Sequence, residues 1–135
     1  RDGADDHLYN EVERAVWQEL GREVGVIARA FGMPLGNAHE VAEAFAAATR
    51  VLFGPEYSYD IRDSAPDEVD LTIRKCAMAE RAREAGENPL AACNVCHAFA
   101  NAAIPDLNRN YAPKYRGSIC AGDSTCSVTI IPRQE

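Results

Sequence analysis

The chain opens with apolar residues at every third or fourth position and with charged residues between them. This spacing predicts two amphipathic helices, one over residues 5–31 and one over residues 37–53. Gly32 and Gly54 should end them, because each is followed within two residues by a proline. The apolar positions of the first helix form one stripe: Leu8, Val12, Val16, Leu20, Val24, Ile27 and Phe31.

The period of the pattern then changes to two. Apolar and polar residues alternate over 57–62 and again over 69–74, on either side of a turn-forming segment at 64–67. Such alternation predicts a β-hairpin with one buried face. A short helix over 77–85 should follow, ending at Gly86.

The last third of the chain repeats the change from helix to hairpin. Asn88 and Pro89 are a suitable start for a helix that should run to Pro105. Residues 115–120 and 126–131 then read as two strands of a closing hairpin.

The predicted order is two helices, a β-hairpin, two helices and a C-terminal β-hairpin. This order is typical of an α+β fold in which an antiparallel sheet is covered by helices. The 135 residues, 47% of them hydrophobic, suit a single domain over 1–135 with a core of its own.

Charge narrows the range of partners. The formal net charge is -7, and a chain this acidic should repel nucleic acid and anionic membrane surfaces. No run of apolar residues approaches the roughly 18 that cross a bilayer, and the first residues lack the apolar core of a signal peptide. We therefore expect a soluble, cytoplasmic protein whose partner is a small molecule, with a homo-oligomer compatible with this reading.

Five cysteines, all in the second half of the chain, carry the candidate chemistry. An odd number with a close Cys-x-x-Cys pair is a poor disulfide framework and favours metal binding or redox work. Four thiolates suit zinc or an iron–sulfur cluster, because both prefer soft sulfur ligands. The candidate metal ligands are Cys76, Cys93, Cys96, Cys120 and Cys126.

The cysteines belong to two segments that should converge. Cys93 and His97 are four residues apart and share one face of the predicted helix, with Cys96 close by. The closing hairpin carries Cys120 and Cys126 and supplies two further ligands. Cys76, just past the second strand, is an alternative to either of these.

The segment CNVCH, residues 93–97, also allows two other chemistries. It has the spacing used for covalent haem attachment, with Cys93 and Cys96 as thioether positions and His97 as iron ligand; a haem of c type would imply a periplasmic location. Alternatively, a cysteine activated by an imidazole or by turn N–H groups acts as a nucleophile, with Cys126 and His97 as the catalytic candidates.

Two stretches of the second half, "VDLTIRKCAMAERAREAGENPLAACNVC" and "GSICAGDSTCSVTI", support a family resemblance. Residues 57–131 resemble the C-terminal half of the L-2-amino-thiazoline-4-carboxylate hydrolase family, whose cysteine and glycine positions correspond here to Cys76, Gly86, Cys93 or Cys96, Gly122 and Cys126. They are also similar to the 4-vinyl reductase-like ligand-sensing domains, in which corresponding cysteines hold a structural zinc near an apolar pocket.

The resemblance implies a small α+β domain with cysteines at one end of its sheet, beside a ligand pocket formed with the N-terminal helices. Our leading expectation is a metal-binding domain that acts as a hydrolase or lyase on a small sulfur- or nitrogen-containing molecule. A c-type monohaem protein and a non-enzymatic ligand-sensing module with structural zinc are the alternatives.

Overall fold

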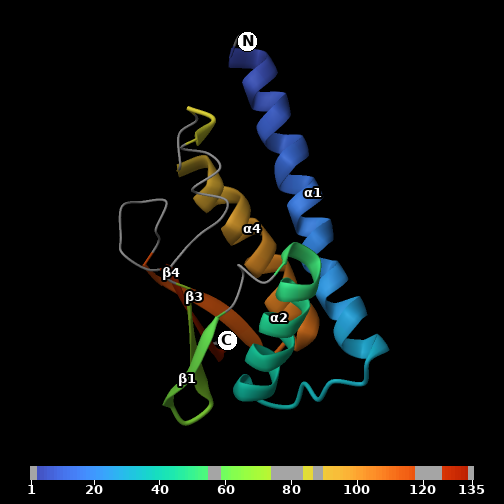
Figure 1. Cartoon of the computed structure of the whole chain (residues 1–135), viewed down its shortest axis with the longest axis vertical. Coiled ribbons are helices and arrows are strands. Elements are labelled where there is room, and N and C mark those ends of the chain that lie inside the picture. The colour runs from blue at the N-terminus through green and yellow to red at the C-terminus, as the bar shows by residue number, and fades with distance from the viewer. Residues whose placement is uncertain (1–2, 55–58, 74–83, 87–89, 118–125, 134–135) are drawn as a thin grey trace.

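The computed structural model describes residues 3–54, 59–73, 84–86, 90–117 and 126–133, and within them the predicted α+β fold is confirmed (Figure 1). Helices α2 and α4 pack against the sheet, and α1 packs along α4. The elements follow one another as α1 (Gly3–Ala30), α2 (Ala38–Phe53), β1 (Asp60–Ala65), β2 (Glu68–Ile73), α4 (Leu90–Leu107), β3 (Tyr111–Gly117) and β4 (Cys126–Pro132).

The predicted ends of the two N-terminal helices are confirmed by their caps. Gly32, in the left-handed region at φ 65°, follows α1, and its N–H donates to the carbonyl of Arg29 at 3.1 Å. The N–H of Met33 reaches the carbonyl of Ala28 at 2.9 Å, which completes a Schellman motif. These bonds satisfy carbonyl groups that the helix end would otherwise leave open.

Helix α2 begins at the predicted capping pair. The side chain of Asn37 accepts a hydrogen bond from the N–H of Glu40 at 2.9 Å. The Glu40 carboxylate reaches one residue further back than a standard capping box and accepts from the N–H of Gly36 at 2.8 Å. Gly54, at φ 101°, ends the helix.

The sheet has four antiparallel strands in the order β1-β2-β4-β3. Strand β4 therefore lies between β2 and β3, and its pairing with β2 joins the two hairpins into one sheet. Val69, Leu71 and Ile73 of β2 are buried under the helices, together with Val128 and Ile130 of β4.

The opposite face of the sheet is polar and cross-linked. Thr129 of β4 donates to Asp70 of β2 at 2.6 Å and accepts from the Arg116 guanidinium of β3 at 3.2 Å. On the same face Thr72 and Ser127 are 3.1 Å apart. Thr129 is fully buried, and these partners satisfy its hydroxyl.

Three predicted boundaries are wrong. Strand β1 lies three residues later than the predicted range 57–62, because the turn is tighter than expected and only Pro66 and Asp67 separate the two strands. Helix α4 continues through Pro105 to Leu107, so the proline occupies the last turn instead of ending the helix. Strand β3 begins at Tyr111, four residues before the predicted start, because Asn108 and Tyr111 close a tight turn with a backbone bond of 3.1 Å. The predicted helix over 77–85 and the turn over 121–124 lie outside the described residues, apart from 84 and 85.

Helices α1 and α4 approach too closely for a side chain to fit between them at Gly21. A Cβ atom built there would lie 2.6 Å from the carbonyl oxygen of Phe99 and 2.9 Å from the Cβ of Ala102. One turn later Gly25 leaves room for the ion pair in which Arg29 binds the Asp106 carboxylate at 3.1 Å. Small residues thus set the spacing of this pair of helices.

The predicted apolar stripe of α1 is not its core-facing side throughout. Val24 and Ala28 are buried beside the two glycines, whereas Val12, Val16 and Phe31 are exposed. At Gly21 and Gly25 the close approach to α4 leaves no room for a larger side chain. Glycine carries little signal in a hydrophobicity pattern, so the pattern does not reveal this contact.

We expect Gly21→Val to lower the free energy of unfolding by about 2 kcal/mol or more, since overpacking a tight contact typically costs about 1–3 kcal/mol. The change is measured by urea unfolding followed by circular dichroism. Ala47→Val, at an exposed position of α2, is the matched control and should cost well under about 1 kcal/mol, the range of helix propensities. Equal losses in the two variants would contradict the close packing.

Candidate functional site

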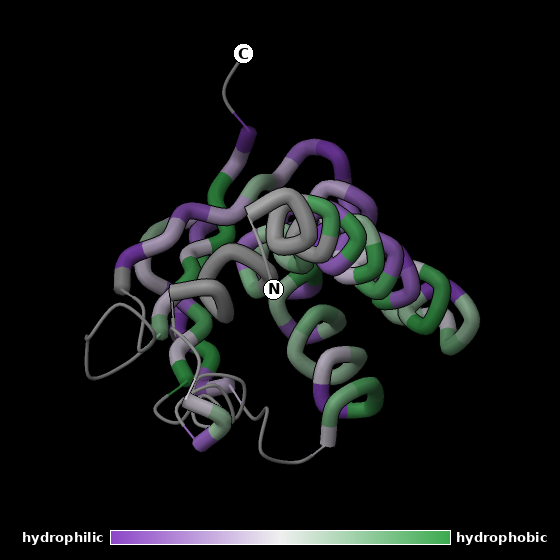
Figure 2. The backbone as a smooth tube through the Cα atoms, turned by 90° about the horizontal axis from the view of Figure 1, so that it is seen from above, coloured by the Kyte–Doolittle hydropathy of each residue, from purple (hydrophilic) through white to green (hydrophobic). Residues whose placement is uncertain are grey.

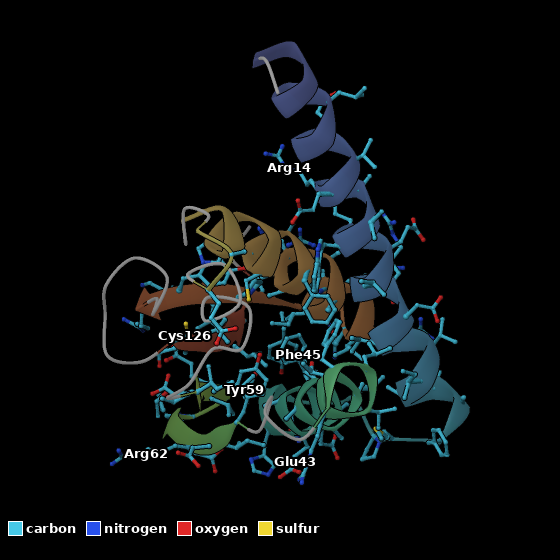
Figure 3. The ribbon with its side chains drawn as sticks, turned by 45° about the horizontal axis from the view of Figure 1, so that its top comes forward. Arg14, Glu43, Phe45, Tyr59, Arg62 and Cys126 are labelled. Atoms are coloured by element: carbon cyan, nitrogen blue, oxygen red, sulfur yellow. The ribbon has the colours of Figure 1, made fainter. Side chains whose placement is uncertain are left out.

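The strand register brings the ends of β2, β3 and β4 together at one end of the sheet. Cys126, the first residue of β4, pairs with Ile73 at the end of β2, and Ser127 pairs with Gly117 at the end of β3. Cys126 is half-buried and packs against Ile73. One cysteine of the predicted set, labelled in Figure 3, therefore lies at this end of the sheet.

Helix α4 places His97 against strand β3. The imidazole stacks on the ring of Tyr115, with centroids 3.8 Å apart and an interplanar angle of 23°. The Tyr115 hydroxyl donates to Asn101 Oδ1 at 2.7 Å and lies 3.1 Å from the carbonyl oxygen of His97. Since His97 and Asn101 are four residues apart, they lie on one face of α4, where His97 contacts the ring of Tyr115 and Asn101 binds its hydroxyl.

Burial sets the protonation of this group. Burial raises the pKa of Tyr115 well above its usual range, and the nearby thiol of Cys96 adds to the shift. Burial also lowers the pKa of His97 from its ordinary value of 6.5. At neutral pH both rings are therefore uncharged, and the group offers a neutral imidazole and a half-buried thiol.

The predicted cysteine site is only partly within the described residues. Cys96 and Cys126 are both half-buried. Cys76 and Cys120 lie outside the described residues, as does the side chain of Cys93, although its backbone belongs to α4. Among the described residues no three potential ligands are close enough to share a metal ion. The roles of His97 and Cys126 as iron ligand, metal ligand or catalytic group stay predictions.

Aromatic side chains form a connected cluster between the helices and the sheet. The ring of Phe99 lies 5.3 Å from that of Phe53 and 6.1 Å from that of Trp17, and Phe45 lies 5.8 Å from both Phe99 and Tyr59. Figure 3 shows Phe45 and Tyr59 in the interior between α2 and the sheet. Only Phe45 and Phe99 are fully buried; the other three are half-buried.

The aromatic cluster reaches the cysteine end of the sheet. Phe53, Tyr59 and Cys126 all pack against Ile73, the last residue of β2. Cys96 lies three residues before Phe99, on the same side of α4. Trp17, Phe53, Tyr59 and Cys126 thus form one contiguous wall around Ile73, with Cys96 on the neighbouring turn of α4.

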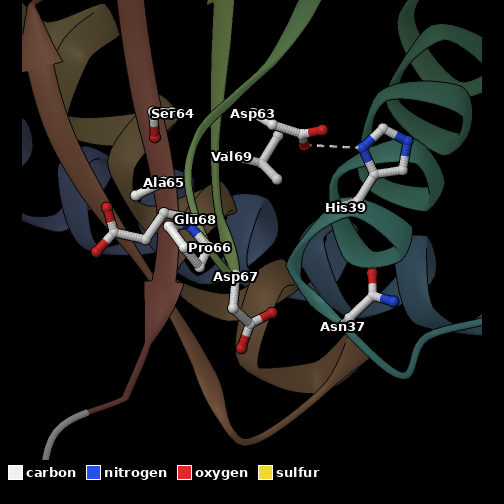
Figure 4. Close-up of a pocket in the computed structure, with 9 residues that line it drawn as sticks. All are labelled: Asn37, His39, Asp63, Ser64, Ala65, Pro66, Asp67, Glu68 and Val69. Carbon is white, nitrogen blue, oxygen red and sulfur yellow. Dashed lines mark hydrogen bonds and ion pairs between the residues drawn. The ribbon is translucent and has the colours of Figure 1, made fainter.

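A second candidate is a pocket of about 550 Å³ where the β1–β2 turn meets the start of α2 (Figure 4). His39 points at Asp63 across it, with Nδ1 and Oδ1 3.1 Å apart, and its Nε2 lies 3.2 Å from Glu43. The hydrogen bond to Asp63 raises the pKa of His39 above 6.5.

A second carboxylate of this pocket, Asp67, is occupied by structural contacts. It accepts from the N–H of Ala38 at 3.0 Å and from the hydroxyl of Tyr111 at 2.6 Å, and this bond raises the pKa of Tyr111 to about 12. Asp67 also takes the left-handed turn position, at φ 57°. The pocket is therefore a junction that ties the hairpin to α2 and β3.

Several site residues were missed by sequence reasoning. The sequence pattern assigns Tyr115 to a strand without giving it a role, and it does not single out Asn101, Phe53 or Phe99. The alternation of Tyr111, Pro113 and Tyr115 is a signal for one face of β3, but its meeting with His97 depends on the placement of α4.

Within the described residues, none of the helices combines the length and the apolar content needed to cross a bilayer. Figure 2 shows hydrophilic residues recurring along the helices.

No protein-family model matches the sequence, and the comparison with curated proteins gives no match. Among solved structures, the chain is similar to the trafficking protein particle complex subunit 3 from Naegleria fowleri, crystallised covalently bound to palmitic acid. The TM-score is 0.56 with 11% identity, and the match covers 95% of this chain and 82% of that one. At this identity the likeness concerns the fold alone.

The two histidines should contribute to stability with opposite pH dependence. The pKa of His39 is raised on folding, so its contribution is present below about pH 6.5 and is lost as the pH rises through the higher folded pKa. The pKa of His97 is lowered, so its contribution is present above about pH 6.5 and is lost as the pH falls through the lower folded pKa.

Urea unfolding of wild type, His39→Gln and His97→Gln at about pH 5.5 and 8.5 tests this, these values bracketing the ordinary histidine pKa. We expect the deficit of His39→Gln to shrink at the higher pH and that of His97→Gln to shrink at the lower. Deficits that change in the same direction would refute the assignment.

Proposed function

We propose that the protein is a binding module for a small apolar molecule, which it accommodates along the wall of aromatic rings that ends at Cys126. The observation that carries this proposal is the half-burial of Trp17, Phe53 and Tyr59. Trp17 packs on Phe53, and Phe53 and Tyr59 both pack against Ile73, so the exposed parts of these rings belong to neighbouring side chains that a single apolar molecule could cover.

The composition of this wall suits an apolar ligand. Pockets for small molecules are lined mostly by hydrophobic and aromatic side chains, with few polar groups that orient the ligand. Here the rings and Ile73 supply the apolar part, and the thiols of Cys96 and Cys126 are weakly polar. Covering such surface is favourable by about 25 cal/mol per Å² of apolar area removed from water.

The fold likeness supports a ligand of the long-chain acyl type. The trafficking protein particle complex subunit 3 binds palmitic acid covalently within a fold similar to this one. A saturated chain makes no directional demands on its site, so a similar arrangement of helices over a sheet can hold one with different side chains. For the present chain we propose non-covalent binding of such an acyl chain.

A structural zinc beside this wall is the second proposal, and the strand register favours it. Cys76 follows Ile73 by three residues, and Cys120 follows Gly117 by three residues. Covalent geometry keeps each of them within about 11 Å of its strand end. Those strand ends adjoin Cys126 in the sheet. We therefore propose that Cys76 and Cys120 join Cys126 in holding the zinc, with Cys93 or Cys96 as a further ligand.

Hydrolase or lyase activity on a sulfur- or nitrogen-containing molecule, an iron–sulfur cluster and haem at residues 93–97 stay predictions. The neutral imidazole of His97 is compatible with base catalysis, yet its stacking on Tyr115 equally suits a structural role. The binding proposal needs none of these chemistries.

Binding can be followed through Trp17, the single tryptophan of the chain, because its ring lies 5.3 Å from that of Phe53. Titration with monomeric sodium palmitate should change its emission in a saturable way and raise the melting temperature, since a ligand that binds only the folded state stabilises it. Sodium acetate should do neither. We expect Phe53→Asn to weaken binding about tenfold, as loss of about 1.4 kcal/mol of contact energy would.

Val51→Asn, two residues away on the exposed side of α2, is the matched control and should bind as wild type does. Circular dichroism verifies that both variants fold. No saturable change with palmitate, or equal weakening by the two substitutions, would refute the binding proposal.

Zinc content is tested separately by elemental mass spectrometry of the purified protein. We expect close to one zinc per chain, and a clear loss of zinc and of melting temperature in Cys126→Ser, because a structural metal contributes to folding free energy. Ser127→Ala is the neighbouring control and should keep its metal.

A visible spectrum distinguishes the alternatives, since haem gives a sharp Soret band and an iron–sulfur cluster a broad brown absorption. Wild type free of metal would contradict the zinc proposal and leave the binding proposal standing.

A further inference from the structure

The outer side of α1 carries an apolar stripe that the rest of the described structure does not cover. Leu8, Val12 and Val16 are 61%, 55% and 51% exposed, and their spacing of four residues places them along one line of the helix. Val12 and Val16, together with Ala15 and Leu20, border a shallow groove of about 420 Å³.

The stripe is exposed for a structural reason. Helix α1 turns Gly21, Gly25 and Ala28 toward α4, so its opposite side faces outward. Figure 1 shows the N-terminal part of α1 extending past the other described elements. A line of exposed branched residues on a helix that protrudes in this way is typical of a protein interface.

Charge indicates what kind of partner fits. The carboxylates of Glu19 and Glu23 line the C-terminal end of the groove. Glu19 pairs with Arg22 of the same helix, which leaves the groove with more negative than positive charge. A complementary surface therefore has apolar side chains followed by basic ones.

A second copy of the chain fits this charge pattern poorly. Parallel pairing would align Glu19 and Glu23 with the same residues of the other copy. Antiparallel pairing centred on Val16 would bring Glu19 level with Glu13. Either arrangement brings carboxylates together at the interface, which opposes association.

We propose that the face of α1 between Leu8 and Glu23 docks an amphipathic helix of a partner protein. That helix carries apolar residues spaced three or four apart, which enter the groove beside Val12 and Val16. Lysine or arginine residues follow about one turn later and meet Glu19 and Glu23. This surface is separate from the aromatic wall proposed to hold a ligand, so the two proposals can fail independently.

The probe is a synthetic helical peptide with leucines spaced four residues apart and two lysines one turn beyond them. Isothermal titration calorimetry on the full chain should show saturable binding that weakens as salt rises, because part of the attraction is between charges. Val16→Asp should lower the affinity at least tenfold. Val51→Asp, at a 73% exposed position of α2, is the matched control and should leave it unchanged.

A charge exchange tests the orientation without touching the apolar residues. Glu23→Lys should weaken binding of the lysine peptide and strengthen binding of the same peptide with glutamates in place of lysines. Equal affinity of wild type for the two peptides, no binding, or no effect of Val16→Asp would overturn the proposal. So would sedimentation that shows a dimer abolished by Val12→Asp, since a second copy would then occupy the face.

Discussion

The backbone contact between α1 and α4 is the constraint on which the arrangement of this protein depends. At Gly21 the two helices come so close that the carbonyl oxygen of Phe99 occupies the place of a side chain. Helix α4 packs between α1 and the sheet. Its position there lets the imidazole of His97 stack on the ring of Tyr115. Because Gly21 faces α4, the opposite side of α1 with Leu8, Val12 and Val16 faces outward. One contact therefore influences both the contacts of His97 and the exposed stripe of α1.

The two faces of the sheet have different chemical character. The polar side is closed by hydrogen bonds that run from Asp70 through Thr129 to Arg116, which tie three strands together without exposing an unsatisfied group. The helical side carries the aromatic rings, which grade from complete burial at Phe45 to half-burial at Trp17. At the cysteine end of the sheet the rings of Phe53 and Tyr59, which pack against Ile73, are half-buried, and the binding proposal depends on their exposed area.

Similarity to a palmitate-bound trafficking subunit has to be weighed against 11% identity. A shared arrangement of helices over a sheet establishes where a pocket can form, whereas the side chains decide what enters it. In this chain those side chains are aromatic rings and thiols, with a tyrosine and an imidazole kept neutral by burial. An apolar ligand agrees with all of them, and a highly charged one would lack a partner there among the described residues.

The helices, the hairpin and their caps were predictable from the sequence because each depends on neighbours in the chain. The caps formed by Asn37 with Glu40 and by Gly32 with Met33 are local hydrogen-bonding patterns. The alternation of apolar and polar residues in β2 indicates which of its faces is buried. The extension of α4 through Pro105 was not predictable in this way, because a proline in the last turn is tolerated once the helix packs on both sides.

Contacts between distant segments were decided by tertiary structure. The sequence identified Cys96, His97 and Cys126 as chemically interesting, but it did not place Tyr115 under His97 or Phe53 beside Ile73. It also predicted one continuous core face for α1 from Leu8 to Phe31, whereas the part that packs most closely on α4 centres on Gly21 and Gly25, and Val12, Val16 and Phe31 are exposed. Hydrophobicity measures how much a side chain gains from burial, and only packing decides whether there is room to bury it.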